Sequence, residues 1–255
     1  MALTQNQKPH IWATRPQPKA GEHAAALAKA GFAPLISPVL EIVPITQPKW
    51  ARPVPDLVLV SSLNGLEFLS PDWHTALQNI PIIVSGTATG ERARQFGFSK
   101  IKISPGQGSR GMVDLVREYF AANPQQTSLL YIAGTPRTPF LENELGPQFN
   151  LQVVEVYASQ LVSELSEEFY AAYERNIIAG VTLFSSRSAV QAATLLRKLA
   201  PTNKNVLTSI EAVCISPSVA DAARQAGFAS AVAATLETED AIIKKLVDQL
   251  NINNK

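Results

Sequence analysis

The sequence predicts an α/β protein made of two similar parallel-sheet domains joined by a two-stranded β connector. Three observations support this fold class. The 255 residues are more than one ordinary hydrophobic core needs. Short apolar runs alternate with helical patterns almost throughout, which is typical of parallel sheets covered by helices on both faces. One strand-and-helix plan also occurs twice, at residues 56–104 and again at residues 180–233.

The expected elements follow one another in a regular order along the chain. Strands are expected at residues 11–15, 34–37, 56–62, 80–85, 100–104, 128–134, 177–186, 211–216 and near 230–234. Helices fill the intervals and close the chain: some end near residues 30, 97, 122, 175, 199 and 227, and others begin near residues 64, 88 and 136.

The segments LAKAGF, ARQFGF and ARQAGF end three of these helices. Gly31, Gly97 and Gly227 suit the left-handed position that follows a helix, and the phenylalanine after each glycine packs as the chain turns into the next strand. Gly97 and Gly227 lie 130 residues apart, and the Ser-Ser pairs that end the strands LVLVSS and VTLFSS lie 124 residues apart. The two stretches are therefore copies of one β-α-β-α-β plan that differ by a short insertion or deletion.

The first strand, helix and strand, at residues 11–38, precede the duplication and need partners elsewhere. The segments VLEIVPI and VVEVYASQLV alternate polar and apolar residues, as a two-stranded ribbon does. We therefore expect a discontinuous domain of residues 1–38 plus 165–255, an inserted domain of residues 52–150, and a connecting β-ladder of residues 39–51 and 151–164. In this plan the active-site cleft lies between the two domains.

Charge and cysteine content exclude several classes of function. The net charge is +1, from 22 Lys and Arg against 21 Asp and Glu, so we expect neither a nucleic-acid partner nor a membrane surface. The single cysteine, Cys214, excludes an internal disulfide framework and fits a reducing compartment. The first ten residues are polar and do not resemble a secretory signal. We expect a cytoplasmic monomer that acts on a small molecule.

The three histidines, His10, His23 and His74, lie far apart in the sequence. None pairs with another His or Cys at the spacing of metal ligands, so no metal site is predicted. We expect all three to be solvated surface residues.

Polar residues gather directly after the strands, where ligands bind in open parallel sheets and where helix N-termini present free backbone amides. With Arg15, Arg137 and Arg187 among them, they predict an anion-binding rim. The expected ligand-binding residues are Thr14, Arg15, Ser61, Ser62, Asn64, Gly86, Thr87, Thr89, Gly134, Arg137, Ser185, Ser186, Arg187, Ser188, Ser216 and Ser218. The alternative for each position is helix capping alone, since Ser, Thr and Asn are preferred N-caps.

Signals for other chemistry are weak. GQGSRG (106–111) has the form of a dinucleotide motif, but it follows the third strand of its repeat, and no acidic residue ends the next strand to hold a ribose. The Ser-Ser pairs have no base beside them, which argues against a nucleophilic serine. Glu41 and Glu155 lie in the connector, where we expect solvent exposure. Tyr157, also in the connector near the expected cleft, has a phenol that can donate or accept a proton, although core packing would equally explain it.

Taken together, these motifs resemble the uroporphyrinogen-III synthase family over about 230 residues. The resemblance rests on the order and spacing of short motifs: ATRP, VSSLNGL, SGTATGERA, YIAGTPR, EVYASQ, FSSRSAV and ISPSVADAARQAGF. It implies two α/β domains of the flavodoxin- or Rossmann-like kind, joined by a two-stranded ladder.

The resemblance also implies a reaction that needs no cofactor. Hydroxymethylbilane, a linear tetrapyrrole with acetate and propionate carboxylates, loses its hydroxyl and closes to uroporphyrinogen III with the terminal pyrrole ring inverted, through a spiro intermediate. Because the uncatalysed closure gives the other isomer, the enzyme's task is orientation and electrostatic stabilisation. An alternative is a two-domain clamp that binds a small polyanion without turnover, and a nucleotide-dependent enzyme is a third interpretation.

Residue by residue, the resemblance assigns Tyr157 as the catalytic residue that assists hydroxyl departure. Thr89 matches the threonine of the family's G-x-x-T-A turn, although Gly90 replaces its alanine. The second copy departs further, because Ser216 replaces the glycine and Val219 the threonine. Ser218 is then the nearest hydroxyl, which favours backbone amides as the groups that bind the ligand there.

Overall fold

The computed structural model describes residues 8–106, 108–199 and 205–250. Gln107 of the GQGSRG motif, residues 200–204 and the two ends of the chain lie outside the described residues. The chain forms two compact units, one of Met1–Glu41 with Gln160–Lys255 and one of residues 42–159. We refer to them as the discontinuous unit and the inserted unit.

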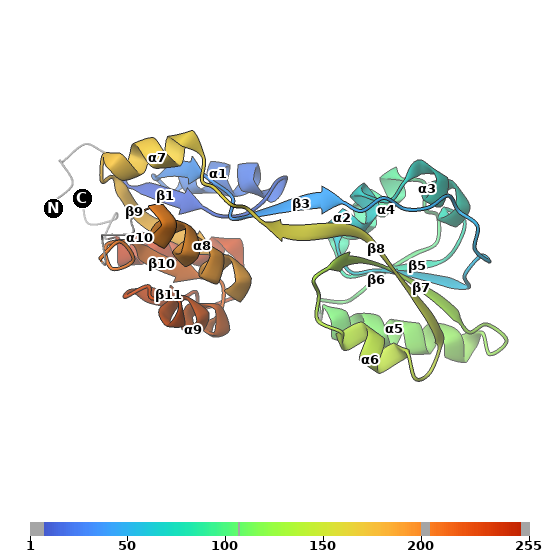
Figure 1. Cartoon of the computed structure of the whole chain (residues 1–255). Coiled ribbons are helices and arrows are strands. Elements are labelled where there is room, and N and C mark those ends of the chain that lie inside the picture. The colour runs from blue at the N-terminus through green and yellow to red at the C-terminus, as the bar shows by residue number, and fades with distance from the viewer. Residues whose placement is uncertain (1–7, 107, 200–204, 251–255) are drawn as a thin grey trace. The chain divides into compact units, whose positions relative to one another are not determined.

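The discontinuous unit contains a five-stranded sheet with the order β11-β10-β9-β1-β2, in which the neighbours pair in parallel. Its strands are β1 (His10–Ala13), β2 (Ala33–Ile36), β9 (Ile178–Leu183), β10 (Glu211–Cys214) and β11 (Ala231–Ala233). Its helices are α1 (Lys19–Lys29), α7 (Glu167–Glu174), α8 (Ser186–Leu199), α9 (Pro217–Gln225) and α10 (Glu239–Gln249). In Figure 1 the blue elements β1 and α1 lie among the orange and red elements of the C-terminal half.

Two hydrophobic clusters cover the two faces of this sheet. One cluster joins Trp12 and Leu183 of the sheet to α7, α8 and α9. The other joins Ile11 and Val213 to Leu27 of α1 and to α10. Neighbouring residues such as Ile11 and Trp12 point to opposite faces of the sheet, and both are fully buried. Burial on both faces explains why the strands are nearly continuous apolar runs in the sequence.

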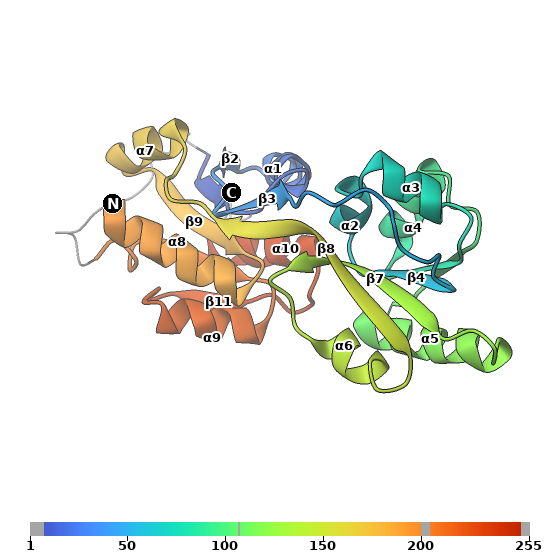
Figure 2. The same ribbon diagram turned by 45° about the vertical axis from the view of Figure 1, so that its right-hand side comes forward.

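The inserted unit contains a sheet with the order β3-β8-β7-β4-β5-β6. Its strands are β3 (Leu40–Pro44), β4 (Leu57–Val60), β5 (Ile82–Val84), β6 (Ile101–Ile103), β7 (Ser128–Thr135) and β8 (Asn150–Leu161). Its helices are α2 (Leu63–Glu67), α3 (Pro71–Leu77), α4 (Thr87–Gln95), α5 (Ser109–Ala122) and α6 (Phe140–Leu145). Figure 2 shows α2, α3 and α4 on one side of this sheet and α5 and α6 on the other, in agreement with two separate core clusters.

The chain passes between the two units in β3 and β8, which are neighbours in the sheet order. The sequence suggests that residues 151–164 belong to a connector. In the structure, β8 instead pairs in parallel with β7 from Asn150 to Ala158, so most of it is a strand of the inserted unit's sheet. Alternation of polar and apolar residues indicates a half-exposed strand, but it does not specify the partner.

The duplication predicted from the sequence is present in both sheets. Strands β4, β5 and β6 are adjacent in one sheet, as β9, β10 and β11 are in the other. The strand that flanks β4 is β7, and the strand that flanks β9 is β1. The segment β1-α1-β2 therefore occupies in one unit the place that β7-α6-β8 occupies in the other.

The glycines that end three helices have the expected left-handed backbone, with φ of 95° at Gly31, 85° at Gly97 and 102° at Gly227. The phenylalanine that follows each of them is buried. The helix expected from residue 64 is instead two short helices, because Pro71 lacks the N–H that a continuous helix needs and begins α3.

Candidate functional site

In the inserted unit, hydroxyl groups join the carboxyl ends of β4 and β5 to each other and to the middle of β7. The hydroxyls of Ser61 and Tyr131 share a hydrogen bond of 2.7 Å, and the Ser85 hydroxyl donates to the Ser61 carbonyl at 2.8 Å. Burial raises the pKa of Tyr131, so its phenol stays protonated. Tyr131 was not predicted from the sequence, because a tyrosine inside the apolar run LLYIA is typical of a core residue.

Tyr157 lies directly over Gly134, its partner on the neighbouring strand. A Cβ atom at position 134 would lie 2.1 Å from Cζ of the Tyr157 ring. The ring is half-buried and 6.1 Å from that of Phe68, and its hydroxyl has no hydrogen-bond partner among the described residues. Tyr157 thus combines a packed ring with a phenol that is free to interact with a ligand.

Arg137 is held by groups of its own chain. It donates to Glu142 at 2.6 Å, to Glu155 at 2.6 Å and to the Gly134 carbonyl at 3.0 Å. Burial acts to lower the pKa of Arg137, but the bonds to Glu155 and Glu142 outweigh it and raise the pKa. Glu155 is exposed as expected, but it also forms an ion pair with Arg137. The ion pairs of Arg137 with Glu142 and Glu155 were not predicted from the sequence.

The helices α2 and α4 begin differently at the same edge. Ser62 caps α2 by accepting from the Asn64 amide at 3.3 Å, whereas the Asn64 side chain has no partner among the described residues. Helix α4 has Gly86 as its N-cap and therefore no side-chain cap. Thr87 is exposed, and Thr89 is buried with its hydroxyl unpartnered within the described chain.

Gly90, which departs from the turn that the sequence resembles, has a structural explanation. A Cβ atom at this position would lie 2.7 Å from Cδ1 of Ile103 on β6. The side chain of Ile103 thus fills the space that an alanine methyl group would need.

In the discontinuous unit, Ser185 and Ser188 cap α8 reciprocally. The Ser188 amide donates to the Ser185 hydroxyl at 3.1 Å, and the Ser185 amide donates to the Ser188 hydroxyl at 3.0 Å. Ser186 is exposed and Arg187 half-buried, and neither side chain has a partner in the described segments. Of the arginines predicted for the rim, Arg187 alone is therefore unpaired in the part of the chain that the structure describes.

The turn before α9 is bridged by its own hydroxyls. The Ser216 and Ser218 hydroxyls are 3.0 Å apart, with Ser216 buried and Ser218 exposed. Neither hydroxyl caps the helix, so the amides at its N-terminus have no side-chain cap.

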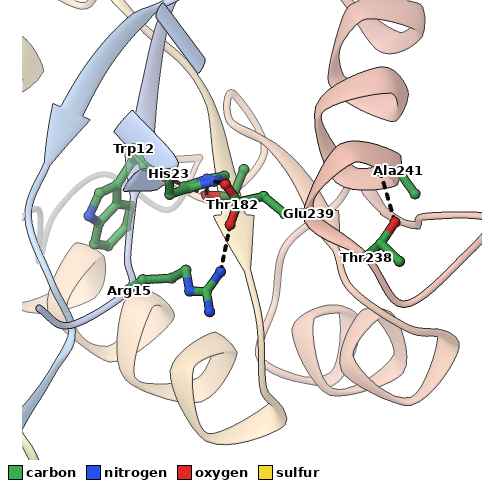
Figure 3. Close-up of polar contacts among 7 residues, drawn as sticks. All are labelled: Trp12, Arg15, His23, Thr182, Thr238, Glu239 and Ala241. Atoms are coloured by element: carbon green, nitrogen blue, oxygen red, sulfur yellow. Dashed lines mark hydrogen bonds and ion pairs between the residues drawn. The ribbon is translucent and has the colours of Figure 1, made fainter. Parts of the chain in front are cut away.

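Thr14 and Arg15 directly follow β1, and Figure 3 shows Arg15 in a polar cluster with His23, Thr182 and Glu239. Thr14 is 1% exposed and donates to the Thr182 carbonyl at 2.6 Å. Arg15 donates to Glu239, the first residue of α10, at 2.7 Å, and its guanidinium lies 4.2 Å from the centre of the Phe184 ring. Burial lowers the pKa of Arg15, and Glu239 offsets part of that effect.

The expectation that all histidines are solvated is wrong for His23 and His74. His23 is fully buried, with Nε2 2.9 Å from the Thr182 hydroxyl and Nδ1 3.5 Å from Glu239. His74 is half-buried and stacks on Phe96 with the ring centres 4.3 Å apart. Burial lowers the pKa of both rings, so each is held in its neutral form.

The structure thus brings some of the sequence-predicted residues together and bonds others within their own unit. Gly134, Arg137 and Tyr157 meet at the end of β7, beside the bulge in β8. The hydroxyls of Thr14, Ser185 and Ser188 form hydrogen bonds inside their own unit.

Among residues 8–106, 108–199 and 205–250, no three His, Cys, Asp or Glu side chains gather as metal ligands. No described helix is long and apolar enough to span a membrane.

Comparison with known proteins gives one consistent result. A family model described as HEM4, uroporphyrinogen-III synthase HemD, matches residues 21–244. A search of the curated proteins found no match. The chain is similar to the crystal structure of uroporphyrinogen-III synthetase from Helicobacter pylori 26695, with 17% identity, a TM-score of 0.59, and 95% of this chain and 100% of that chain covered. It is also similar to a mutant uroporphyrinogen III synthase from Thermus thermophilus, with 16% identity, a TM-score of 0.51, and 97% and 100% covered. At these identities the two structures show a shared fold.

Proposed function

The chain belongs to the uroporphyrinogen-III synthase family, and we propose that it cyclises hydroxymethylbilane to uroporphyrinogen III with loss of water. The reaction makes it a cyclising lyase of tetrapyrrole and haem biosynthesis. The observation that supports the role of this particular chain is the seating of Tyr157, whose ring is packed on Gly134 while its hydroxyl remains unpartnered among the described residues.

Tyr157 acts as the acid for departure of the hydroxyl. The carbon–oxygen bond of the hydroxymethyl group breaks, its electron pair leaves with oxygen, and the phenol proton completes a water molecule. The pyrrole nitrogen supplies electrons to the carbon left behind, which gives an azafulvenium cation. Closure through the spiro intermediate inverts the terminal ring, and the proton finally lost from a pyrrole carbon balances the one that the phenol gave. A positioned general acid contributes typically ~10²-fold or more.

Uncommitted donors hold the substrate carboxylates in this proposal. In the inserted unit the candidates are the backbone amides that begin α4 and the side chains of Thr87 and Thr89. In the discontinuous unit they are the side chains of Ser186 and Arg187. Apart from Arg187 these donors are neutral, and neutral donors bind carboxylates without opposing a nearby cation, which suits a reaction that passes through one. Ser185 and Ser188 contribute through the geometry of the α8 N-terminus, because their hydroxyls are already bonded to each other.

One experiment separates this function from its alternative. Purified protein is incubated with hydroxymethylbilane, and the product isomers are separated by chromatography. We expect isomer III, whereas a non-enzymatic polyanion clamp would bind the bilane tightly and leave the isomer ratio of spontaneous closure unchanged.

We further propose that the protein works in the cytoplasm as a monomer. Cys214 is buried, and burial raises its pKa to about 12, so the thiol is unreactive and forms no exposed bridging site. Size-exclusion chromatography with light scattering tests the monomer, since a dimer would elute with twice the mass of 27.5 kDa.

A further inference from the structure

We propose that Arg137 is a positioning residue that seats the catalytic Tyr157, rather than a residue that binds a substrate carboxylate. This inference rests on the function proposed above. It changes the role that the sequence suggested for the arginine, which follows β7 at the expected anion-binding rim.

The first support is that the guanidinium of Arg137 is already hydrogen-bonded within the protein. Its guanidinium bonds to three groups on three different elements: the Gly134 carbonyl on β7, Glu142 on α6 and Glu155 on β8. The side chain is 24% exposed. The planar guanidinium with its fixed donor directions suits such a three-way contact, which a lysine ammonium reproduces poorly.

The second support is that two of these contacts flank the irregularity that carries Tyr157. Ala133 pairs with Glu155, but the next residue, Gly134, pairs with Tyr157, so β8 has one extra residue at this point. A bulge of this kind changes the direction of the side chains beside it. Arg137 bonds to one group on each side of the bulge, Gly134 on β7 and Glu155 on β8, and thereby holds the two strands in the register that places the phenol.

The third support is the close fit of the ring on the strand that Arg137 holds. The hypothetical Cβ at position 134 would lie within 2.1–2.6 Å of three Tyr157 atoms, Cζ, Cε2 and the hydroxyl oxygen. Any shift of the Gly134 peptide therefore moves the surface on which the phenol rests. A small misplacement of a reacting group is enough to reduce the rate strongly.

Charge balance gives Arg137 a second way to hold this region. Glu142 and Glu155 both point at the guanidinium, and the second carboxylate oxygen of Glu142 is buried without a hydrogen-bond partner in the described chain. Without Arg137, two carboxylates would face each other with no compensating charge. They would move apart, and the strand that carries Glu155 would move with one of them.

A double-mutant cycle tests the inference. Arg137→Gln should lower kcat by about ten- to a hundredfold with little change in KM, because the substrate still binds while the phenol is misplaced. In a Tyr157→Phe background the same change should cause almost no further loss, since Arg137 acts through the hydroxyl that is already absent. Arg117→Gln is the matched control: it removes an ion pair with Glu144 in the same unit, without contact to β7 or β8, and should leave kcat and KM as in the wild type.

A pair of variants at Glu155 covers the case in which Arg137→Gln fails to fold. Glu155→Ala removes the contact on β8 and should lower kcat several-fold, whereas Glu155→Gln keeps an acceptor oxygen and should recover most of it. Three results would each overturn the positioning role. Arg137→Gln could raise KM tenfold at unchanged kcat, or it could lower kcat equally in the wild-type and Tyr157→Phe proteins. The third is full activity of Glu155→Ala. A wild-type protein that yields only isomer I would instead overturn the proposed function, and this inference with it.

Discussion

The ring of Tyr157 occupies space that is open only because residue 134 has no side chain. Such a fit is typical of glycines where another group approaches the backbone closely. The hydroxyl at the far end of the ring has no partner among the described residues, which suits a group that must meet a substrate.

Replacing Tyr157 with Phe should therefore lower kcat by about ten- to a hundredfold, because the ring still packs while the proton donor is lost. Steady-state kinetics with hydroxymethylbilane measures the effect. Tyr173→Phe removes a phenol from α7 of the other unit and should leave the rate unchanged. Near-full activity of Tyr157→Phe would leave Tyr157 as a packing residue.

His23 makes stability depend on pH. Its ring is fully buried against Thr182, and Arg15 and Glu239 lie beside it. Burial lowers its pKa below the usual 6.5. Below about pH 6.5 the unfolded chain binds a proton that the folded ring resists, so the free energy of unfolding falls with the pH in this range.

We expect His23→Gln to reduce this dependence. Urea unfolding at about pH 8 and about pH 5.5 should show a smaller difference in stability for the variant than for the wild type, because glutamine does not titrate. Equal differences for the two proteins would mean that His23 is not the group responsible.

Among the helices, α8 differs from α4 and α9 in the way it begins. Ser185 and Ser188 exchange backbone-to-hydroxyl bonds at its N-terminus, whereas α4 and α9 have no side-chain cap. The amides of α4 and α9 are thus the ones left for a ligand, and those of α8 are partly satisfied by the chain itself.

Ser185→Ala should accordingly lower the free energy of unfolding by about 1 kcal/mol, the usual effect of removing an N-cap. Ser186→Ala, next to it, removes an exposed hydroxyl with no partner in the described residues and should change stability by less than about 0.5 kcal/mol. Urea denaturation compares the two, and similar values for both variants would contradict the capping role.

The order and type of most elements could be predicted from the sequence, because buried parallel strands and amphipathic helices leave strong periodic patterns. The pairing of β8 with β7 could not, since alternation gives the exposed face of a strand and not its neighbour. The ion-pair partners of Arg15 and Arg137 also could not be predicted from the sequence. Glu239 lies 224 residues from Arg15 in the sequence, and only the folded chain brings them together.

The whole molecule consists of one duplicated α/β plan with its chain interrupted. In the inserted unit the segment β7-α6-β8 follows the repeated strands, whereas the equivalent β1-α1-β2 precedes them by more than a hundred residues. The core clusters respect this division, because each contains residues of one unit only. Equivalent strand ends therefore occur in both units, but the side chains that form hydrogen bonds there differ between the two.

Arg15 and Arg137, both predicted for the anion-binding rim, follow strands that the sheet order shows to be equivalent, but their contacts differ. Arg15 is paired with Glu239 at the start of α10, whereas Arg137 bonds to two strands and a helix beside Tyr157. The contacts of Arg137 lie next to the bulge beside Tyr157, which is why we propose a positioning role for it.

The most direct test of the proposed function is the isomer composition of the product at increasing enzyme concentration. Hydroxymethylbilane closes spontaneously to isomer I, so the enzyme must capture it first. We predict that the fraction of isomer III rises with enzyme until it is nearly the whole product, and that Tyr157→Phe needs about ten- to a hundredfold more protein to reach the same fraction. Isomer I as the only product at every concentration of wild-type protein would contradict the proposed function.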